Sequence, residues 1–304
     1  MITKAEAAAF ERDIRERYLP LAKKLKVVED NINKLVIDSM ANAKMSAAYW
    51  KAQSAKLDAL YKEMNALFDS WAKTNIPSRY KRSLAQISQR IRANRIILNT
   101  AKKNATELLS SSASRNIVFG LYSSSVESFL SASVAGNRAL RNLFITAQQT
   151  LVDESLINVA VGAGFEMGDL RQAKSLLSTI FKSPQWEMVQ QNQFVQAGRY
   201  RYKPSYYAEL LARTKFHQAH SQATLVQSAN YGTDLVEISS HNTTTPICIP
   251  YEGNTYSISG TSKVFPPLPD SPPFHPNCLH LMYPTFESGL IAEGVLNEEG
   301  ELVA

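Results

Sequence analysis

The sequence predicts a mainly α-helical protein that ends in a small, proline-rich α+β module. Apolar side chains recur every three or four positions through most of residues 1–230, as they do on the buried face of a helix. Nine of the 13 prolines then lie at positions 246, 250, 266, 267, 269, 272, 273, 276 and 284. Two short β-prone runs, at 235–238 and 254–259, fall in the same stretch. We therefore expect a long N-terminal helical hairpin or bundle, followed by a short-stranded module that a metal ion could close.

Two amphipathic helices are expected to form the hairpin. The first covers about residues 23–43, and its apolar stripe is Leu25, Val28, Ile32, Leu35, Val36 and Met40. The second follows Ser46 as its N-cap, and its stripe is Leu57, Leu60, Tyr61, Met64, Leu67, Phe68 and Trp71. We expect this helix to end before Pro77, because proline lacks an N–H donor and disfavours helical geometry at Ile76. The two stripes would then be buried against each other.

Further helices are expected beyond Pro77. One covers 80–109 and ends at the serine cluster 110–114, since serines favour caps and turns. Others follow at 115–152, 169–181 and 206–228. The sequence thus divides into an N-terminal helical hairpin (1–76), a basic helical region (77–152), a helical middle domain (153–230), a Cys/His proline-rich module (231–285) and an acidic tail (286–304).

Positive charge is concentrated in the N-terminal half of the chain. Residues 1–150 hold 24 Lys and Arg against 12 Asp and Glu, whereas residues 151–304 hold 9 against 15. Nine basic residues follow one another with no acidic residue among them: Lys73, Arg79, Lys81, Arg82, Arg90, Arg92, Arg95, Lys102 and Lys103. Such a run attracts the phosphates of nucleic acid or an acidic protein surface. It also fits a plain solvated helix face, and no zinc-finger, RNP or helix-turn-helix pattern accompanies it, so all three interpretations stay open.

Both cysteines and three of the five histidines lie in the proline-rich module. Cys248 and Cys278 could supply thiolates, and His275 and His280 imidazoles, to a tetrahedral zinc site, with His241 as an alternate ligand. Two other uses of these residues stay open. The cysteines could be buried packing residues with the histidines bonded to loop carbonyls, or the two cysteines could form a disulfide. A cysteine nucleophile is less favoured, because no helix start frames Cys248.

The composition excludes several classes of protein. No apolar run approaches the ~20 residues of a membrane-spanning helix, and Lys4 and Glu6 interrupt the region that a signal peptide would keep apolar. Two cysteines cannot form the multi-bridge framework of a small secreted domain. We therefore expect a cytosolic product that is neither secreted nor inserted in a membrane.

The C-terminal third contains a series of short motifs in a fixed order. They are Tyr206-Tyr207, Leu211-Ala212-Arg213-Thr214, the run 232–241, Thr245-Pro-Ile-Cys248, Tyr251-Glu-Gly253, the run 256–260 and the run 272–280. Together they resemble the C-terminal signature of tailed-phage minor capsid proteins, the phage minor capsid protein 2 and Mu F-like head morphogenesis families. The segment from Trp71 to Tyr80 is a weaker match to the same families.

The resemblance implies a virion structural protein at the portal vertex or the inner capsid surface. It implies the portal protein and the major capsid protein as partners, packaged DNA nearby, a few copies per virion and assembly in the host cytoplasm. It implies no established catalytic activity, and the apolar runs described above predict no membrane contact. Two alternatives from other classes are a zinc- or cysteine-dependent hydrolase carried in the virion and delivered to the host, and a free DNA-binding protein.

This chain departs from the Mu F-like pattern at the positions that concern metal binding. Many of those relatives carry cysteines where this chain has Thr245 and His280, and an Asp and an Arg where it has His241 and Thr243. If the family has a metal site, its ligands in this chain would be Cys248, His275, Cys278 and His280.

Overall fold

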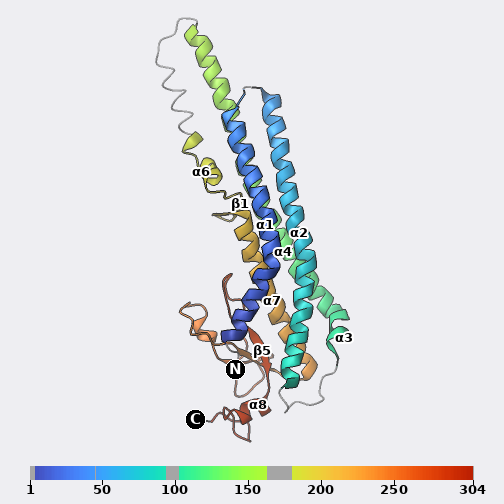
Figure 1. Cartoon of the computed structure of the whole chain (residues 1–304). Coiled ribbons are helices and arrows are strands. Elements are labelled where there is room, and N and C mark those ends of the chain that lie inside the picture. The colour runs from blue at the N-terminus through green and yellow to red at the C-terminus, as the bar shows by residue number, and fades with distance from the viewer. Residues whose placement is uncertain (1–3, 45, 94–102, 163–179, 304) are drawn as a thin grey trace. The chain divides into compact units, whose positions relative to one another are not determined.

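The computed structural model describes residues 4–44, 46–93, 103–162 and 180–303. Its elements, in chain order, are α1 (Lys4–Ala41), α2 (Ala47–Ala93), α3 (Ala105–Ser110), α4 (Ser112–Gly162), α6 (Pro184–Gln190), β1 (Val195–Ala197), β2 (Tyr200–Tyr202), α7 (Pro204–Tyr231), β3 (Leu235–Ile238), the 3₁₀ turn η1 (Ile249–Tyr251), β4 (Thr255–Ser257), β5 (Met282–Thr285) and α8 (Glu287–Ala292). Long helices come first and a small module of short strands follows (Figure 1). The predicted fold class is confirmed.

The chain forms two compact units. Unit 1 consists of Met1–Tyr18, Trp71–Ser125 and Leu210–Ala304, and unit 2 consists of Leu19–Ser70 and Val126–Glu209. The helices α1, α2, α4 and α7 each contribute one part to each unit. The five segments predicted from the sequence divide the chain differently, and they stay a prediction.

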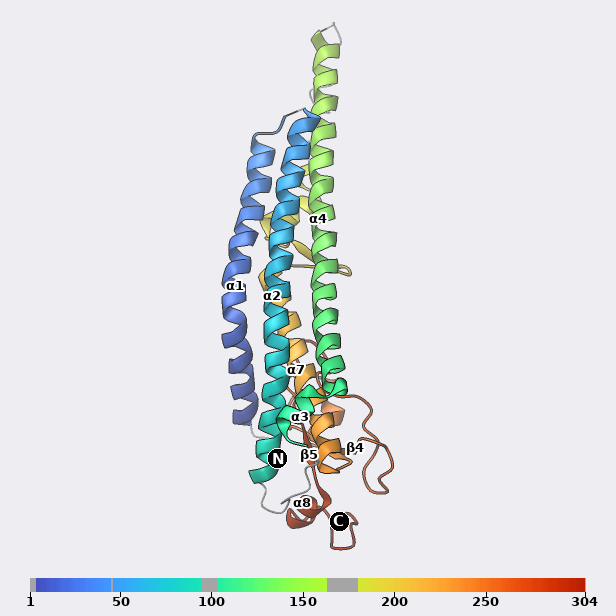
Figure 2. The same ribbon diagram turned by 90° about the vertical axis from the view of Figure 1, so that its right-hand side faces the viewer.

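The apolar stripes that predicted the hairpin form the core of unit 2. There α1 lies beside α2 (Figures 1 and 2), and the buried side chains of the two stripes are Leu25, Val28, Ile32, Val36, Leu57, Tyr61, Met64 and Phe68. The helix α4 completes this core, because Phe129 stacks on Phe68 with ring centroids 4.2 Å apart. Burying a side chain of this kind contributes ~1.5–3 kcal/mol.

A glycine lets α4 approach the polypeptide just before the β1–β2 hairpin of unit 2. A Cβ at Gly136 would lie 2.0 Å from the carbonyl oxygen of Phe194. The hydroxyl of Tyr61 donates a hydrogen bond to the same oxygen at 2.6 Å. Sequence reasoning did not predict this hairpin, whose two strands have three residues each. Its position depends on the contact at Gly136, which no local pattern reveals.

The core of unit 1 contains charged groups as well as aromatic rings. Trp71 of α2 stacks on Phe216 of α7 with centroids 5.7 Å apart. Arg79 is buried, with 1% of its surface exposed; its Nη1 donates to Asp13 at 2.9 Å, and its guanidinium lies over the ring of Phe10. In unit 1, therefore, α1 and α2 are joined by an ion pair and a cation–π contact in addition to apolar packing.

The prediction that the second helix ends before Pro77 is wrong. The helix α2 continues to Ala93 with Pro77 inside it. Proline removes one helical hydrogen bond, but Trp71, Ile76 and Tyr80 on either side of it are all buried. Their burial offsets the lost bond, and a rule that considers only neighbouring residues cannot anticipate that.

The predicted helix break at the serine cluster is confirmed, but the prediction of a single helix over 80–109 is wrong. The helix α2 ends at Ala93, and the separate helix α3 begins after its N-cap Asn104. The helix α3 ends at Ser110 and α4 begins at Ser112. The hydroxyl of Ser111 donates to the carbonyl of Leu108 at 2.7 Å and accepts from the backbone N–H of Ser114 at 3.2 Å. The serine side chain thus satisfies backbone groups at the end of one helix and the start of the next. Of the helix predicted at 169–181, only residues 180 and 181 lie within the described part of the chain.

One helical stretch among the described residues is long and apolar enough to cross a membrane. It is Ser112–Val152 of α4, which contains a window with a mean hydropathy of 1.2. Length and composition alone do not distinguish such a span from the core helix of a soluble protein. Within unit 2, Phe129, Leu140 and Phe144 of this helix are buried in the protein core. The absence of membrane contact stays a prediction.

Candidate metal centre in the C-terminal module

The C-terminal module of unit 1 is built on a three-stranded antiparallel sheet in which β3 lies between β4 and β5. The helix α7 supports this module through two hydrogen bonds. Thr224 Oγ1 donates to the carbonyl of Met282 at 2.7 Å, and Ser221 Oγ donates to the carbonyl of Pro272 at 2.6 Å. These two bonds hold the polypeptide on both sides of Cys278.

Two tight turns bring the cysteines together. The N–H of Cys248 donates to Thr245 O at 2.9 Å, and the N–H of Cys278 donates to His275 O at 2.9 Å. The sulfurs of Cys248 and Cys278 and a ring nitrogen of His275 all lie within 4.8 Å of one another. Both cysteines are buried free thiols, so the structure does not contain the disulfide considered from the sequence.

The donor set of this cluster fits zinc. Ligands of a tetrahedral zinc at ~2.0–2.3 Å lie about 3.3–3.8 Å from one another, which is compatible with the 4.8 Å limit that Cys248, His275 and Cys278 satisfy. Two thiolates and an imidazole are also the ligands that zinc prefers over magnesium or calcium. In the structure they converge although Cys248 and Cys278 are 30 positions apart in the sequence.

The protonation of Cys248 depends on what occupies the cluster. Burial, followed by the neighbouring Cys278 and the charge of Glu252, raises the pKa of the Cys248 thiol to about 12. Without a cation nearby the thiol is therefore protonated and poorly nucleophilic at neutral pH. A metal ion would reverse this preference, because the ligand is the thiolate and binding releases the proton.

His280 adjoins the cluster and is held by Glu252. Its Nε2 lies 3.3 Å from Glu252 Oε1, and its Nδ1 lies 3.5 Å from the sulfur of Cys278. A carboxylate only accepts, so Nε2 carries the proton and the lone pair of Nδ1 faces the cysteine. Burial lowers the pKa of His280, which favours this neutral form. A carboxylate that fixes the tautomer of a histidine in this way is typical of the outer shell of a zinc site.

Glu252, which sequence reasoning missed, also organises the loop after β3. Its two oxygens accept hydrogen bonds from the backbone N–H groups of His241 and Thr243, the latter at 2.9 Å. Burial alone would raise the pKa of Glu252, but these bonds and the one from His280 lower it overall. The Tyr251-Glu-Gly253 motif was the available signal for this role.

The alternate ligand His241 is placed beside the cluster and not within it. Its Nε2 lies 2.7 Å from the hydroxyl of Ser239, and its ring centroid lies 5.0 Å from that of His280. The structure thus brings Cys248, His275 and Cys278 together, with His280 adjacent to them and His241 beside His280.

The basic run divides into paired and exposed side chains. Arg79 and Arg82 both contact the carboxylate of Asp13, and Arg90 donates to Glu6 at 2.5 Å. No acidic residue lies within the run itself, but these three arginines find acidic partners on α1, which lies far away in the sequence. Of the remaining members, Lys73, Lys81, Arg92 and Lys103 are exposed, whereas Arg95 and Lys102 lie outside the described residues.

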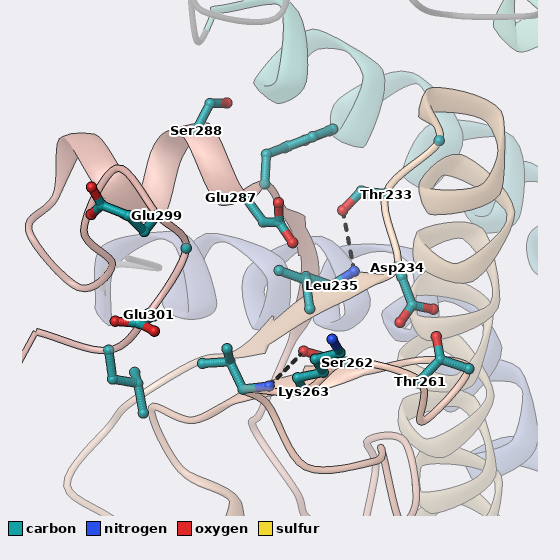
Figure 3. Close-up of a pocket in the computed structure, with 15 residues that line it drawn as sticks. Thr233, Asp234, Leu235, Thr261, Ser262, Lys263, Glu287, Ser288, Glu299 and Glu301 are labelled. Carbon is teal, nitrogen blue, oxygen red and sulfur yellow. Dashed lines mark hydrogen bonds between the residues drawn. The ribbon is translucent and has the colours of Figure 1, made fainter.

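A pocket of about 1120 Å³ lies beside the sheet of unit 1, between the start of β3, the loop at 261–264 and the C-terminal segment (Figure 3). Four carboxylates, those of Asp234, Glu287, Glu299 and Glu301, line it with a single basic residue, Lys263. The carboxylate of Asp234 is engaged by the hydroxyl of Ser257 and the N–H of Ser259. These carboxylates make the lining of the pocket negatively charged. Three of them come from the segment 286–304, which the sequence identifies as an acidic tail.

The described residues thus form long helices and a small module in which two cysteines and a histidine converge. A comparison with family models gives the family: the model described as phage minor capsid protein 2 matches residues 28–290. The chain belongs to this family, and the resemblance noted in the C-terminal third is confirmed. No curated protein and no solved structure matched the chain in the corresponding comparisons. Membership in a minor capsid family implies a location in the virion among other virion proteins, and the family is generally non-enzymatic.

Proposed function

We propose that this protein is a minor capsid protein that docks at the portal vertex or the inner capsid surface during head assembly. Its partners there are the portal protein and the major capsid protein. The observation that carries the proposal is the family match over residues 28–290, which includes most of the helical region and all of the C-terminal module. The module is the docking part, and the exposed basic residues of α2 form a second contact surface.

A zinc ion closes the docking module in this proposal. Cys248, His275 and Cys278 would hold it, with Nδ1 of His280 as the nearest further donor. A closed site of four protein ligands has a structural role, and its binding free energy adds to folding stability. The zinc would fix the loops 239–254 and 258–281, which have little regular structure of their own.

Exposed apolar side chains next to the cysteines form the proposed docking face. Ile247 and Ile249 flank Cys248 and are 52% and 54% exposed, and Leu279 follows Cys278 and is 43% exposed. Since the two cysteines are in proximity, these three side chains lie around the same point of the module. Exposed aliphatic side chains on a rigid base are typical of a protein-binding surface.

Portal capture by the purified full-length chain tests the docking face. The double substitution Ile249→Ser and Leu279→Ser is expected to lower the amount of portal protein retained by ~10-fold or more, since buried interface anchors each contribute over 1 kcal/mol. The matched control is Val27→Ser, which removes an exposed aliphatic side chain (59% exposed) from α1. Retention of wild-type capture by the double variant would contradict the proposal.

Metal analysis of the purified chain tests the zinc site. We expect about one zinc per chain, lost in Cys278→Ser, and a lower melting temperature after treatment with a chelator. Ser288 is an exposed residue that lines the pocket and lies outside the cysteine and histidine cluster, so Ser288→Ala is the control. A chain without metal whose melting temperature is insensitive to chelator would show that ordinary packing closes the module.

The structure gives less support to the hydrolase alternative. A catalytic zinc needs an open ligand position and a free general base. The carboxylate of Glu252, whose charge acts on Cys248, already accepts hydrogen bonds from His241, Thr243 and His280. If a hydrolytic activity of the virion were lost in Cys278→Ser while the protein stayed folded and incorporated, the hydrolase alternative would replace the structural one.

A further inference from the structure

A groove in unit 1 combines an apolar floor with a basic rim. It has a volume of about 500 Å³ and lies between α2, α3 and α4. Apolar parts of its lining come from Pro77, Leu109, Val118, Phe119 and Tyr122. Phe119 is the most exposed of the large apolar side chains described, with 69% of its surface accessible. An aromatic ring this exposed beside a groove is typical of an interaction surface.

The charges around this groove are all of one sign. Lys73, Lys81 and Arg115 line it, and no acidic residue does. None of the three forms a salt bridge with a described residue, in contrast to Arg79, Arg82 and Arg90 of the same basic run. The groove therefore attracts an occupant that carries both carboxylates and apolar side chains. The apolar floor favours a protein segment over DNA, because phosphates would leave that floor exposed to water.

The C-terminal segment of this chain has the complementary chemistry. Glu298, Glu299 and Glu301 are exposed there (Figure 3 shows the last two), and Leu302 and Val303 beside them are 58% and 54% exposed. The segment is ordered, since the N–H of Val303 donates to Val295 O at 3.0 Å. It thus presents two aliphatic side chains and three carboxylates on a fixed turn.

We propose that the groove binds the 298–303 segment of a second copy of this chain. Leu302 and Val303 would contact the apolar floor next to Phe119, and the glutamates would face Lys73, Lys81 and Arg115. The two surfaces are different parts of the molecule, so the contact is heterologous and links copies head to tail, either into a closed ring or into an open chain. This inference does not depend on the proposed docking to the portal, and either can fail without the other.

Sedimentation of the purified full-length chain over a range of concentrations tests the proposal. We expect concentration-dependent association that weakens as salt screens the charges, and that falls by ~10-fold in Phe119→Ser or Lys81→Glu. Both side chains are exposed, so neither change should affect folding. The matched control is Lys51→Glu, an exposed lysine of α2 in unit 2, which should associate as the wild type does.

A charge exchange tests the identity of the occupant. Glu299→Lys alone should weaken association as Lys81→Glu does, and the two substitutions in one chain should restore it. A chain that stays monomeric at every concentration would overturn the proposal. Association that is unchanged in Phe119→Ser and Lys81→Glu would also overturn it. So would a charge exchange that fails to restore association, because the 298–303 segment would then not be the occupant of the groove.

Discussion

At the scale of single residues, Glu252 shows how one carboxylate can organise a loop-rich module. It accepts from two backbone N–H groups of the loop after β3 and fixes the tautomer of His280. Its pKa is lowered because these bonds to the charged form outweigh burial. A group whose pKa is lowered by folding stabilises the protein above its unfolded pKa, and this contribution is lost as the pH falls through the folded value.

Glu252→Gln is accordingly expected to destabilise the protein by ~1–3 kcal/mol at neutral pH, since a neutral amide cannot accept all three bonds as well as a carboxylate does. The difference in melting temperature between wild type and variant should be complete above pH 4.5, the ordinary value for Glu, and should shrink as the pH falls below it. Thermal melts between pH 3 and pH 7 measure this. Glu293→Gln, at an exposed position of the same unit, is the control, and a pH-independent difference would contradict the assignment.

Substitutions at the two ends of the Arg79–Asp13 ion pair should have unequal effects, because Arg79 is buried and Asp13 is partly exposed. Asp13 accepts from Arg17, Arg79 and Arg82, whereas Nε and Nη2 of Arg79 have no hydrogen-bond partner among the described residues. Removing the carboxylate leaves a buried cation without its counter-charge, so Asp13→Ala should cost ~3–5 kcal/mol. Arg79→Met replaces the cation with an apolar side chain of similar length and should cost far less.

Denaturant titration of the two variants measures this order. The free energy of unfolding of Arg79→Met should lie closer to that of the wild type than that of Asp13→Ala does. If Arg79→Met were instead the less stable variant, the contacts of Arg79, including its position over Phe10, would contribute more to stability than the burial of its charge costs.

At the scale of elements, Gly120 and Gly136 of α4 lie in opposite environments. A Cβ at Gly136 would meet the backbone of Phe194 at 2.0 Å, whereas a Cβ at Gly120 would meet nothing within 4 Å. Backbone atoms cannot move aside as the end of a flexible side chain can. The first glycine is therefore required by packing, and the second only weakens the helix.

Alanine at these two positions should have opposite effects. Gly136→Ala should destabilise the protein by ~1–3 kcal/mol through overpacking, although alanine favours the helix. Gly120→Ala should stabilise it by ~0.5–1 kcal/mol, since alanine has fewer unfolded conformations to lose. Chemical denaturation of the two variants measures both values. Equal stabilisation by both substitutions would show that the hairpin at 195–202 does not pack on α4 in solution.

At the scale of the whole molecule, the pairing of charges limits how strongly the chain can bind DNA. If nine basic residues contacted phosphates, a plot of the logarithm of the DNA-binding constant against the logarithm of the salt concentration would have a slope of about −8. Arg79, Arg82 and Arg90 are engaged by Asp13 and Glu6, which leaves four of the described members of the run exposed. We expect any DNA binding by the basic run to show a slope no steeper than about −4.

Substitutions within the run distinguish exposed from paired residues. Arg92→Ala should reduce the magnitude of the slope by about 1, because Arg92 is exposed. Arg82→Ala should leave the slope unchanged, since Asp13 holds its guanidinium. Fluorescence anisotropy with a double-stranded oligonucleotide at several salt concentrations measures both. A slope near −8, or equal effects of the two substitutions, would show that the ion pairs open when DNA binds.

The sequence by itself determined the fold class, the helical hairpin, the serine break and the family. These depend on signals that are local or ordered along the chain: the spacing of apolar residues from Leu25 to Trp71, the cap at Ser111 and the motifs between residues 200 and 285. The cysteines and histidines of the module could likewise be named as candidate ligands, because few residue types bind zinc.

Only the tertiary structure decided how those residues are used. It brought Cys248, His275 and Cys278 together, placed His241 outside the cluster and made Glu252 the partner of His280. It also carried α2 through Pro77 and paired the arginines of α2 with the acidic residues of α1. In each case the energy comes from contacts between residues far apart in the sequence. Burial and charge pairing at such contacts outweigh the local preferences from which the sequence is interpreted.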